Sequence, residues 1–115
     1  MANEKSFLSG NTTMLILKLL EEKDMYGYQI IEELAKRSDE TFRLKKGTLY
    51  PLLHGLENDD MVSSYDRDAD SARIRKYYHL TEKGRGLLSE RKREWTTYLQ
   101  AVNGVMEGGY SCDFA

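Results

Sequence analysis

The chain of 115 residues is long enough for one small domain with a hydrophobic core. Its formal charge of -2 argues against a protein that coats nucleic acid indiscriminately, although local charge can still serve a site-specific binder. No hydrophobic stretch approaches the roughly 20 residues of a membrane span, no signal peptide is recognisable, and Cys112 is the single cysteine. We therefore expect a soluble cytoplasmic protein without an internal disulfide.

Two helices are predicted in the first third of the chain. Residues 1–10 are polar and predict a flexible arm or a short helical start. Asn11 or Thr12 can cap a first helix that is apolar nearly all round. Such a helix is typical of the centre of a core. A turn between Asp24 and Gly27 precedes a second helix, whose predicted inward residues are Ile30, Ile31 and Leu34.

The middle of the chain predicts a short strand and a helix with one buried side. Residues 41–44 alternate between polar and apolar and predict the strand. From about Thr48 to Asp59, helical spacing predicts a helix that buries Leu49, Leu52, Leu53 and Leu56. Pro51 is expected in its first turn, because an interior proline clashes with the carbonyl four residues back. The polar N-terminal end then faces outward, as in a recognition helix that enters the DNA major groove.

A β-hairpin is predicted next, with strands over 61–65 and 73–80 and a polar loop over 67–72. Alternation along the second strand separates two faces, one with Ile74, Tyr78 and Leu80 and the other with Arg75, Tyr77 and His79. Aspartates bring negative charge to the hairpin tip, so we expect phosphate contacts from arginines at the strand base and no insertion of the tip into the minor groove. These aspartates are Asp66, Asp68 and Asp70.

A last helix is predicted from the cap Thr81, with Glu82 placed against its dipole, to about Met106. One side of this helix carries an apolar stripe based on a seven-residue repeat. A protruding helix cannot hide such a stripe against a small core, so we expect a second copy of the chain to cover it. The predicted dimerisation residues are Leu88, Trp95, Tyr98, Leu99, Val102, Val105 and Met106.

The order of these elements is that of a winged helix-turn-helix, an α+β but mostly α fold, extended by a long C-terminal dimerisation helix. We expect a flexible arm over 1–10 and a DNA-binding winged helix-turn-helix domain over 11–80. The dimerisation helix is expected over 81–107, and a disordered tail, which includes Cys112, over 108–115.

Three strings in the chain resemble the PadR family of bacterial transcriptional regulators: residues 26–28 (YGY), 47–53 (GTLYPLL) and 75–81 (RKYYHLT). The resemblance extends over about 11–106. The single long C-terminal helix is similar to the short PadR subgroup, which includes a lactococcal multidrug-sensing repressor with a similarly placed tryptophan. The resemblance implies a regulator that is usually a dimeric repressor. Some members respond to phenolic acids, others to drug-like aromatics, and many have no known effector.

The candidate DNA contacts are basic or polar residues around the recognition helix and the second hairpin strand. Hydroxyl groups at a helix N-terminus suit phosphate oxygens, and cations neutralise backbone charge. Tyr50 is either a core residue or a DNA contact, His54 either an exposed helix residue or a base reader, and Tyr78 is expected in the core. The candidates are Lys45, Lys46, Thr48, Tyr50, Pro51, His54, Arg73, Arg75 and Lys76.

A small aromatic effector is expected to bind, if one exists, at Trp95, Tyr98 and Leu99, because an indole offers a flat face for stacking. Trp95 alternatively only packs an interface. His54 and His79 lack partners at metal-ligand spacing, and no nucleophile or phosphate-loop motif occurs, so we expect no metal, cofactor or enzymatic activity.

We therefore expect a homodimeric repressor that binds an inverted-repeat operator and releases it when a small aromatic molecule binds. One alternative is a winged-helix module that binds proteins and not DNA. Another is a constitutive repressor without an effector. The operator, the regulated genes, the direction of regulation and the role of Cys112 are left open by the sequence.

Overall fold

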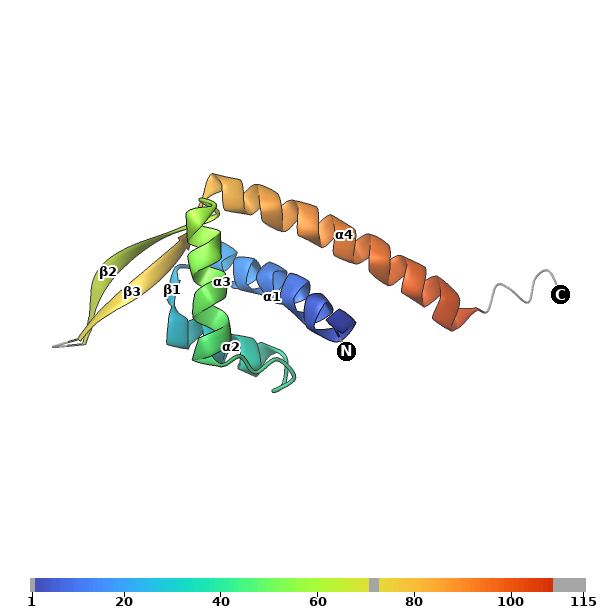
Figure 1. Cartoon of the computed structure of the whole chain (residues 1–115), viewed down its shortest axis with the longest axis horizontal. Helices are drawn as coiled ribbons and strands as arrows, with labels where there is room; N and C mark the ends of the chain where they lie inside the picture. Colours follow the sequence, from blue (N-terminus) through green and yellow to red (C-terminus); the bar gives the residue numbers. More distant parts are fainter. Residues whose placement is uncertain (1, 71–72, 109–115) are drawn as a thin grey trace.

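A computed structural model of the chain describes residues 2–70 and 73–108, with side chains for 11–68 and 73–108 (Figure 1). It confirms the predicted fold class, a mostly helical winged helix-turn-helix with a long last helix. The three strands form one antiparallel sheet in the order β1-β3-β2. The elements are α1 (Ala2–Glu22), β1 (Met25–Tyr26), α2 (Gly27–Arg37), α3 (Lys46–Asn58), β2 (Val62–Asp70), β3 (Arg73–Leu80) and α4 (Glu82–Glu107).

The hydrophobic core lies where α1, α2, α3 and the base of the sheet meet. Its centre is the apolar C-terminal half of α1, and each fully buried leucine or isoleucine there contributes about 1.5–3 kcal/mol. On α3 the predicted stripe is confirmed at Leu49, Leu53 and Leu56, whereas Leu52 is partly buried. Tyr78 is fully buried, as predicted. The stripe therefore holds α3 against the body and leaves its other side exposed.

Helix α1 starts at Ala2, so the predicted start at Asn11 or Thr12 is wrong. Of the two alternatives for residues 1–10, the helical start, and not the flexible arm, agrees with the structure of residues 2–10. A residue that can cap a helix does not have to be its first residue, because a polar residue inside a helix lowers its stability by only tenths of a kcal/mol. No proline interrupts this stretch. Thr12 is buried within the helix, where its side chain faces the core.

The predicted strand over 41–44 does not form, and its place in the sheet is taken by β1, which pairs with β3 through Met25↔Tyr78 and Tyr26↔Tyr77. The alternation of polar and apolar residues over 41–44 comes from core packing and not from strand pairing. Phe42 and Leu44 pack against the core from a segment without a partner strand. Before it, the Ser38 hydroxyl accepts a 2.9 Å hydrogen bond from the Phe42 N–H and so fixes a turn.

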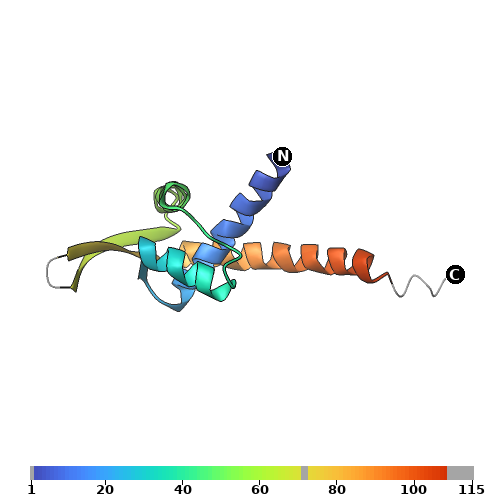
Figure 2. The same ribbon diagram turned by 90° about the horizontal axis from the view of Figure 1, so that it is seen from below.

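Strand β2 reaches Asp70, so most of the loop predicted over 67–72 is strand, and only residues 71–72 between the strands lie outside the described chain. Opposite charges at Asp66↔Lys76 favour this longer ladder. The hairpin extends beyond the core (Figures 1 and 2). For this reason Ile74 is 65% exposed, although its strand face also carries the buried Tyr78 and Leu80.

Helix α3 begins at Lys46, and Pro51 is its sixth residue, not a member of the first turn as predicted. Proline has no N–H, so the Gly47 carbonyl loses its α-helical donor. The first turn is secured differently. The Lys45 carbonyl accepts hydrogen bonds from both Thr48 and Leu49, each at 2.9 Å. We infer that the buried leucine stripe outweighs the lost bond.

Helix α4 begins as predicted, because the Thr81 hydroxyl accepts a 3.0 Å hydrogen bond from the Gly84 N–H and Glu82 lies in the first turn. Its only buried residues in the described chain are Gly84 and Leu88, both near its start. Beyond them the helix leaves the body, in the direction opposite to the hairpin (Figures 1 and 2). None of the described helices combines the length and the apolar character needed to cross a membrane.

The end of α4 bears on two predictions. Gly108 caps the helix in a left-handed conformation with φ 50°, which suits a residue without Cβ. It is therefore a helix cap and not the first residue of a disordered tail. The predicted tail from 109 to 115, with Cys112, lies outside the described residues.

Candidate nucleic-acid interface

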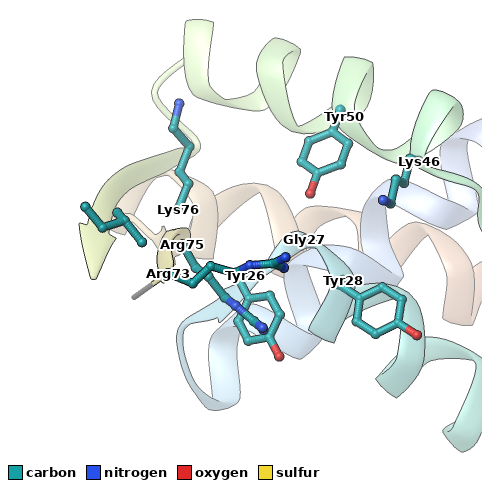
Figure 3. Close-up of a pocket in the computed structure, with 9 residues that line it drawn as sticks. Tyr26, Gly27, Tyr28, Lys46, Tyr50, Arg73, Arg75 and Lys76 are labelled. Carbon is teal, nitrogen blue, oxygen red and sulfur yellow. The ribbon is translucent and has the colours of Figure 1, made fainter. Parts of the chain in front are cut away.

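A groove of about 480 Å³ lies between the start of α2, the start of α3 and strand β3 (Figure 3). It follows the edge of β3 beyond the two residues that pair with β1. Elements distant in sequence therefore contribute to one surface. The lining residues are Tyr26, Gly27, Tyr28, Lys46, Tyr50, Arg73, Ile74, Arg75 and Lys76.

The charge of this groove is uniformly positive. Its lining contains two arginines and two lysines, and no acidic side chain. Arg43, which precedes α3 in the chain, does not line the groove, and its charge is paired with that of Glu40. A concave surface lined by cations and tyrosine hydroxyls attracts an anionic chain and offers it hydrogen-bond donors.

Tyr50 lies over Gly27, and this contact joins α3 to the start of α2 (Figure 3). A Cβ atom at Gly27 would stand 2.6 Å from Cζ of the Tyr50 ring, so a larger residue here would have to displace that ring. The ring is half-buried yet still lines the groove. Tyr50 therefore contributes both to packing and to the candidate site, and neither of the two interpretations excludes the other.

Five of the nine candidate DNA contacts line the groove: Lys46, Tyr50, Arg73, Arg75 and Lys76. The other four lie outside its lining but are exposed on α3 or just before it. These four are Lys45, Thr48, Pro51 and His54. The candidate interface therefore consists of the groove and of the exposed residues of α3 next to Lys46 and Tyr50.

Sequence reasoning missed four residues of the groove, which are Tyr26, Gly27, Tyr28 and Ile74. Tyr26 and Tyr28 flank Gly27 in the YGY string, which had been noted only as part of the family resemblance. Ile74 shares a strand face with Tyr78, which is buried, and yet Ile74 is exposed and lines the groove. Hydropathy gave no signal for these residues, because only the packing of α2 beside β3 brings them to the groove.

Asp24 ties the base of the hairpin to the turn before β1. Its carboxylate accepts a 2.6 Å hydrogen bond from the Tyr65 hydroxyl and lies 2.8 Å from Nδ1 of His79. Burial acts to raise the pKa of Asp24, but these two hydrogen bonds outweigh it, so the pKa lies below its ordinary value. The lowered pKa of Asp24 stabilises the folded state. This stabilisation is complete at pH values above the ordinary carboxyl pKa and is lost as the pH falls through the lowered pKa of Asp24.

A second surface lies on the outer part of α4. Trp95 and Val102 are half-buried, and the Trp95 and Tyr98 rings lie 6.0 Å apart. Val105 and Met106 are 80% and 76% exposed. Leu88, which had been predicted as part of this stripe, belongs instead to the core of its own chain because α1 packs over the start of α4. The exposed stripe thus begins at Trp95.

Comparison with known proteins places these features among transcriptional regulators. A family model for the transcriptional regulator PadR-like family matches residues 16–90. An uncharacterized protein X of Lysinibacillus sphaericus is 36% identical over 101 residues, 88% of this chain and 93% of that protein. A transcriptional regulator of Mycobacterium tuberculosis is 33% identical over 89 residues, 77% of this chain and 79% of that protein. The crystal structure of a PadR-like transcriptional regulator from Bacillus cereus aligns with a TM-score of 0.79 at 28% identity, covering 90% of this chain and 98% of that one.

Proposed function

This chain belongs to the PadR-like family of transcriptional regulators, and from that premise we propose that it is a homodimeric repressor of an inverted-repeat operator. Members of the family are regulators and not enzymes, and they bind DNA. In the proposed complex, the exposed side of α3 enters the major groove. The cationic groove beside it receives the sugar–phosphate backbone of one strand.

The observation that carries this proposal is the convergence of four cations at the start of the recognition helix. Lys46 comes from α3, whereas Arg73, Arg75 and Lys76 come from β3. A winged-helix module that binds only proteins has no need for an acid-free groove at this place. The aspartates of β2 lie opposite groove residues of β3, Asp66 opposite Lys76 and Asp68 opposite Ile74. The proposed phosphate contacts of β3 therefore lie toward the tip of the hairpin and not at its base.

The test measures binding to a mixed-sequence DNA duplex at several salt concentrations. Lys46→Ala and Arg75→Ala should each weaken binding about tenfold and reduce the slope of log K against log salt by about 0.9, because each loses one phosphate contact. Lys92→Ala, at an exposed position of α4, removes the same charge far from the groove and should leave the slope unchanged. Unchanged affinity and slope in both groove variants would contradict the proposal.

We propose that the exposed stripe of α4 is covered by a second copy of the chain. Residues from Trp95 to Met106 form an apolar side too long for the core of one chain to cover. A two-fold dimer is favoured because the same stripe can then cover itself. It would also set the spacing between two recognition helices, which an inverted-repeat operator requires.

We also propose that a flat aromatic effector binds between subunits near Trp95, Tyr98 and Leu99. The two aromatic rings on one side of α4 support this site. An effector there would change the spacing of the recognition helices and so couple to operator affinity. A constitutive repressor, in which Trp95 only packs, is the alternative.

Fluorescence of Trp95, the only tryptophan, distinguishes these two cases. If the effector site exists, flat cationic dyes should quench Trp95, and dye and operator DNA should change each other's affinity by the same factor. Fluorescence that stays constant across a panel of aromatic dyes, after inner-filter correction, would leave Trp95 as a packing residue and favour the constitutive repressor.

A further inference from the structure

Arg75 does not extend freely into the groove. Its guanidinium carbon lies 4.4 Å from the centre of the Tyr26 ring, which is a cation–π distance (Figure 3). Directly opposite Arg75 on the neighbouring strand is Arg67, and like charges at such a position repel. Arg67 lies over another ring, at 4.9 Å from the centre of Tyr77. Separate aromatic faces thus hold the two arginines.

The Tyr26 ring also contacts a neighbouring tyrosine. Its backbone pairs with Tyr77, and the two rings meet edge to face at 5.3 Å. Tyr77 stacks on Tyr65 at 5.8 Å, and the Tyr65 hydroxyl donates to the carboxylate of Asp24. The support for Arg75 therefore runs through three tyrosines and ends on an ionised carboxylate at the base of the sheet.

We propose that Tyr26 is a positioning residue for DNA binding: its ring holds the Arg75 guanidinium in the groove, ready to meet a phosphodiester. A preset side chain binds more tightly because less conformational freedom is lost on contact. The guanidinium keeps its N–H donors in its plane, so stacking on a ring leaves them available for phosphate oxygens. This inference rests on the proposed function of the groove.

The test is a double-mutant cycle with a mixed-sequence duplex. Tyr26→Leu should weaken binding about three- to tenfold when Arg75 is present and have no effect in an Arg75→Ala background. Tyr26→Phe keeps the ring and removes only the hydroxyl, so its effect should be smaller than that of Tyr26→Leu and equal in both Arg75 backgrounds. Tyr28→Leu is the control, because Tyr28 lines the same groove outside the stack, and its effect should be equal in both backgrounds.

Equal losses from Tyr26→Leu in both backgrounds would overturn the positioning role while leaving the groove as the DNA site. A second measurement needs no DNA. In the free protein, the Nε–H resonance of Arg75 should carry a ring-current shift that Tyr26→Phe retains and Tyr26→Leu removes. If Arg75→Ala leaves DNA binding unchanged, the proposed function of Arg75 fails, whatever the resonance shows. If the resonance does not change in Tyr26→Leu, the positioning inference fails.

Discussion

Replacing Leu99 with aspartate is expected to convert the proposed dimer into monomers and to abolish tight operator binding. Leu99 lies in the exposed stripe of α4, 40% exposed in the single chain and buried in the proposed interface. An unpaired carboxylate at that place would cost about 3–5 kcal/mol on each side of the seam, so the two sides together would weaken association by roughly ten-thousandfold or more. Because both half-sites must be bound together, operator affinity should fall with dimerisation.

The control is Thr97→Asp, which introduces the same charge on the opposite, exposed side of α4. Sedimentation velocity should find this variant dimeric and Leu99→Asp monomeric at the same concentration. The unfolding temperature of the monomer should also show that the winged domain is folded. A fully dimeric Leu99→Asp protein would place the seam elsewhere.

Replacing Gly84 with alanine should destabilise the protein by about 1–3 kcal/mol, because the start of α4 has no space for a methyl group. A Cβ atom there would stand 2.6 Å from Cδ1 of Leu80 and closer still to the carbonyl oxygen of Met61. That carbonyl is fixed in place, since it accepts hydrogen bonds from both the N–H and the hydroxyl of Thr81, at 3.1 and 3.0 Å. The added methyl therefore has to push α4 away from the sheet.

Gly86→Ala provides a matched comparison two residues along the same helix. A Cβ atom at Gly86 meets nothing within 4 Å. The same substitution should therefore stabilise the protein by about 0.5–1 kcal/mol, since alanine favours helix over glycine. Urea midpoints should move in opposite directions for the two variants. If Gly84→Ala unfolds at the parent's midpoint or above it, the tight junction between α4 and the sheet is wrong.

The recognition helix was predictable because its leucine spacing reports a local periodicity, and the cap at Thr81 was predictable because its hydrogen bond closes within three residues. The errors in the sheet arose where tertiary packing decides the outcome. Residues 41–44 have the alternation of a strand but no partner, whereas Met25 and Tyr26 form a strand because β3 lies beside them. No pattern within either segment distinguishes these cases.

The charged residues of the candidate site were predictable because they, too, are close together in the sequence. Its charges come from short basic strings beside α3 and in β3, which the sequence makes visible. The aromatic support of Arg75 was not visible, since it joins Tyr26 to a strand some fifty residues away. Leu88 was predicted at the dimer interface but lies in the core. A seven-residue repeat does not distinguish a core contact with α1 from a contact with a second chain.

The central claim is that duplex DNA binds across the start of α3 and the cationic edge of β3. It is tested most directly by titrating the ¹⁵N-labelled protein with a mixed-sequence duplex of about 20 base pairs, long enough for two half-sites, at low salt. The account predicts that amide resonances of residues 46–50 and 73–76 shift or broaden, while those of residues 90–94 on α4 change little. Perturbations confined to α4, or no binding at low salt, would contradict it.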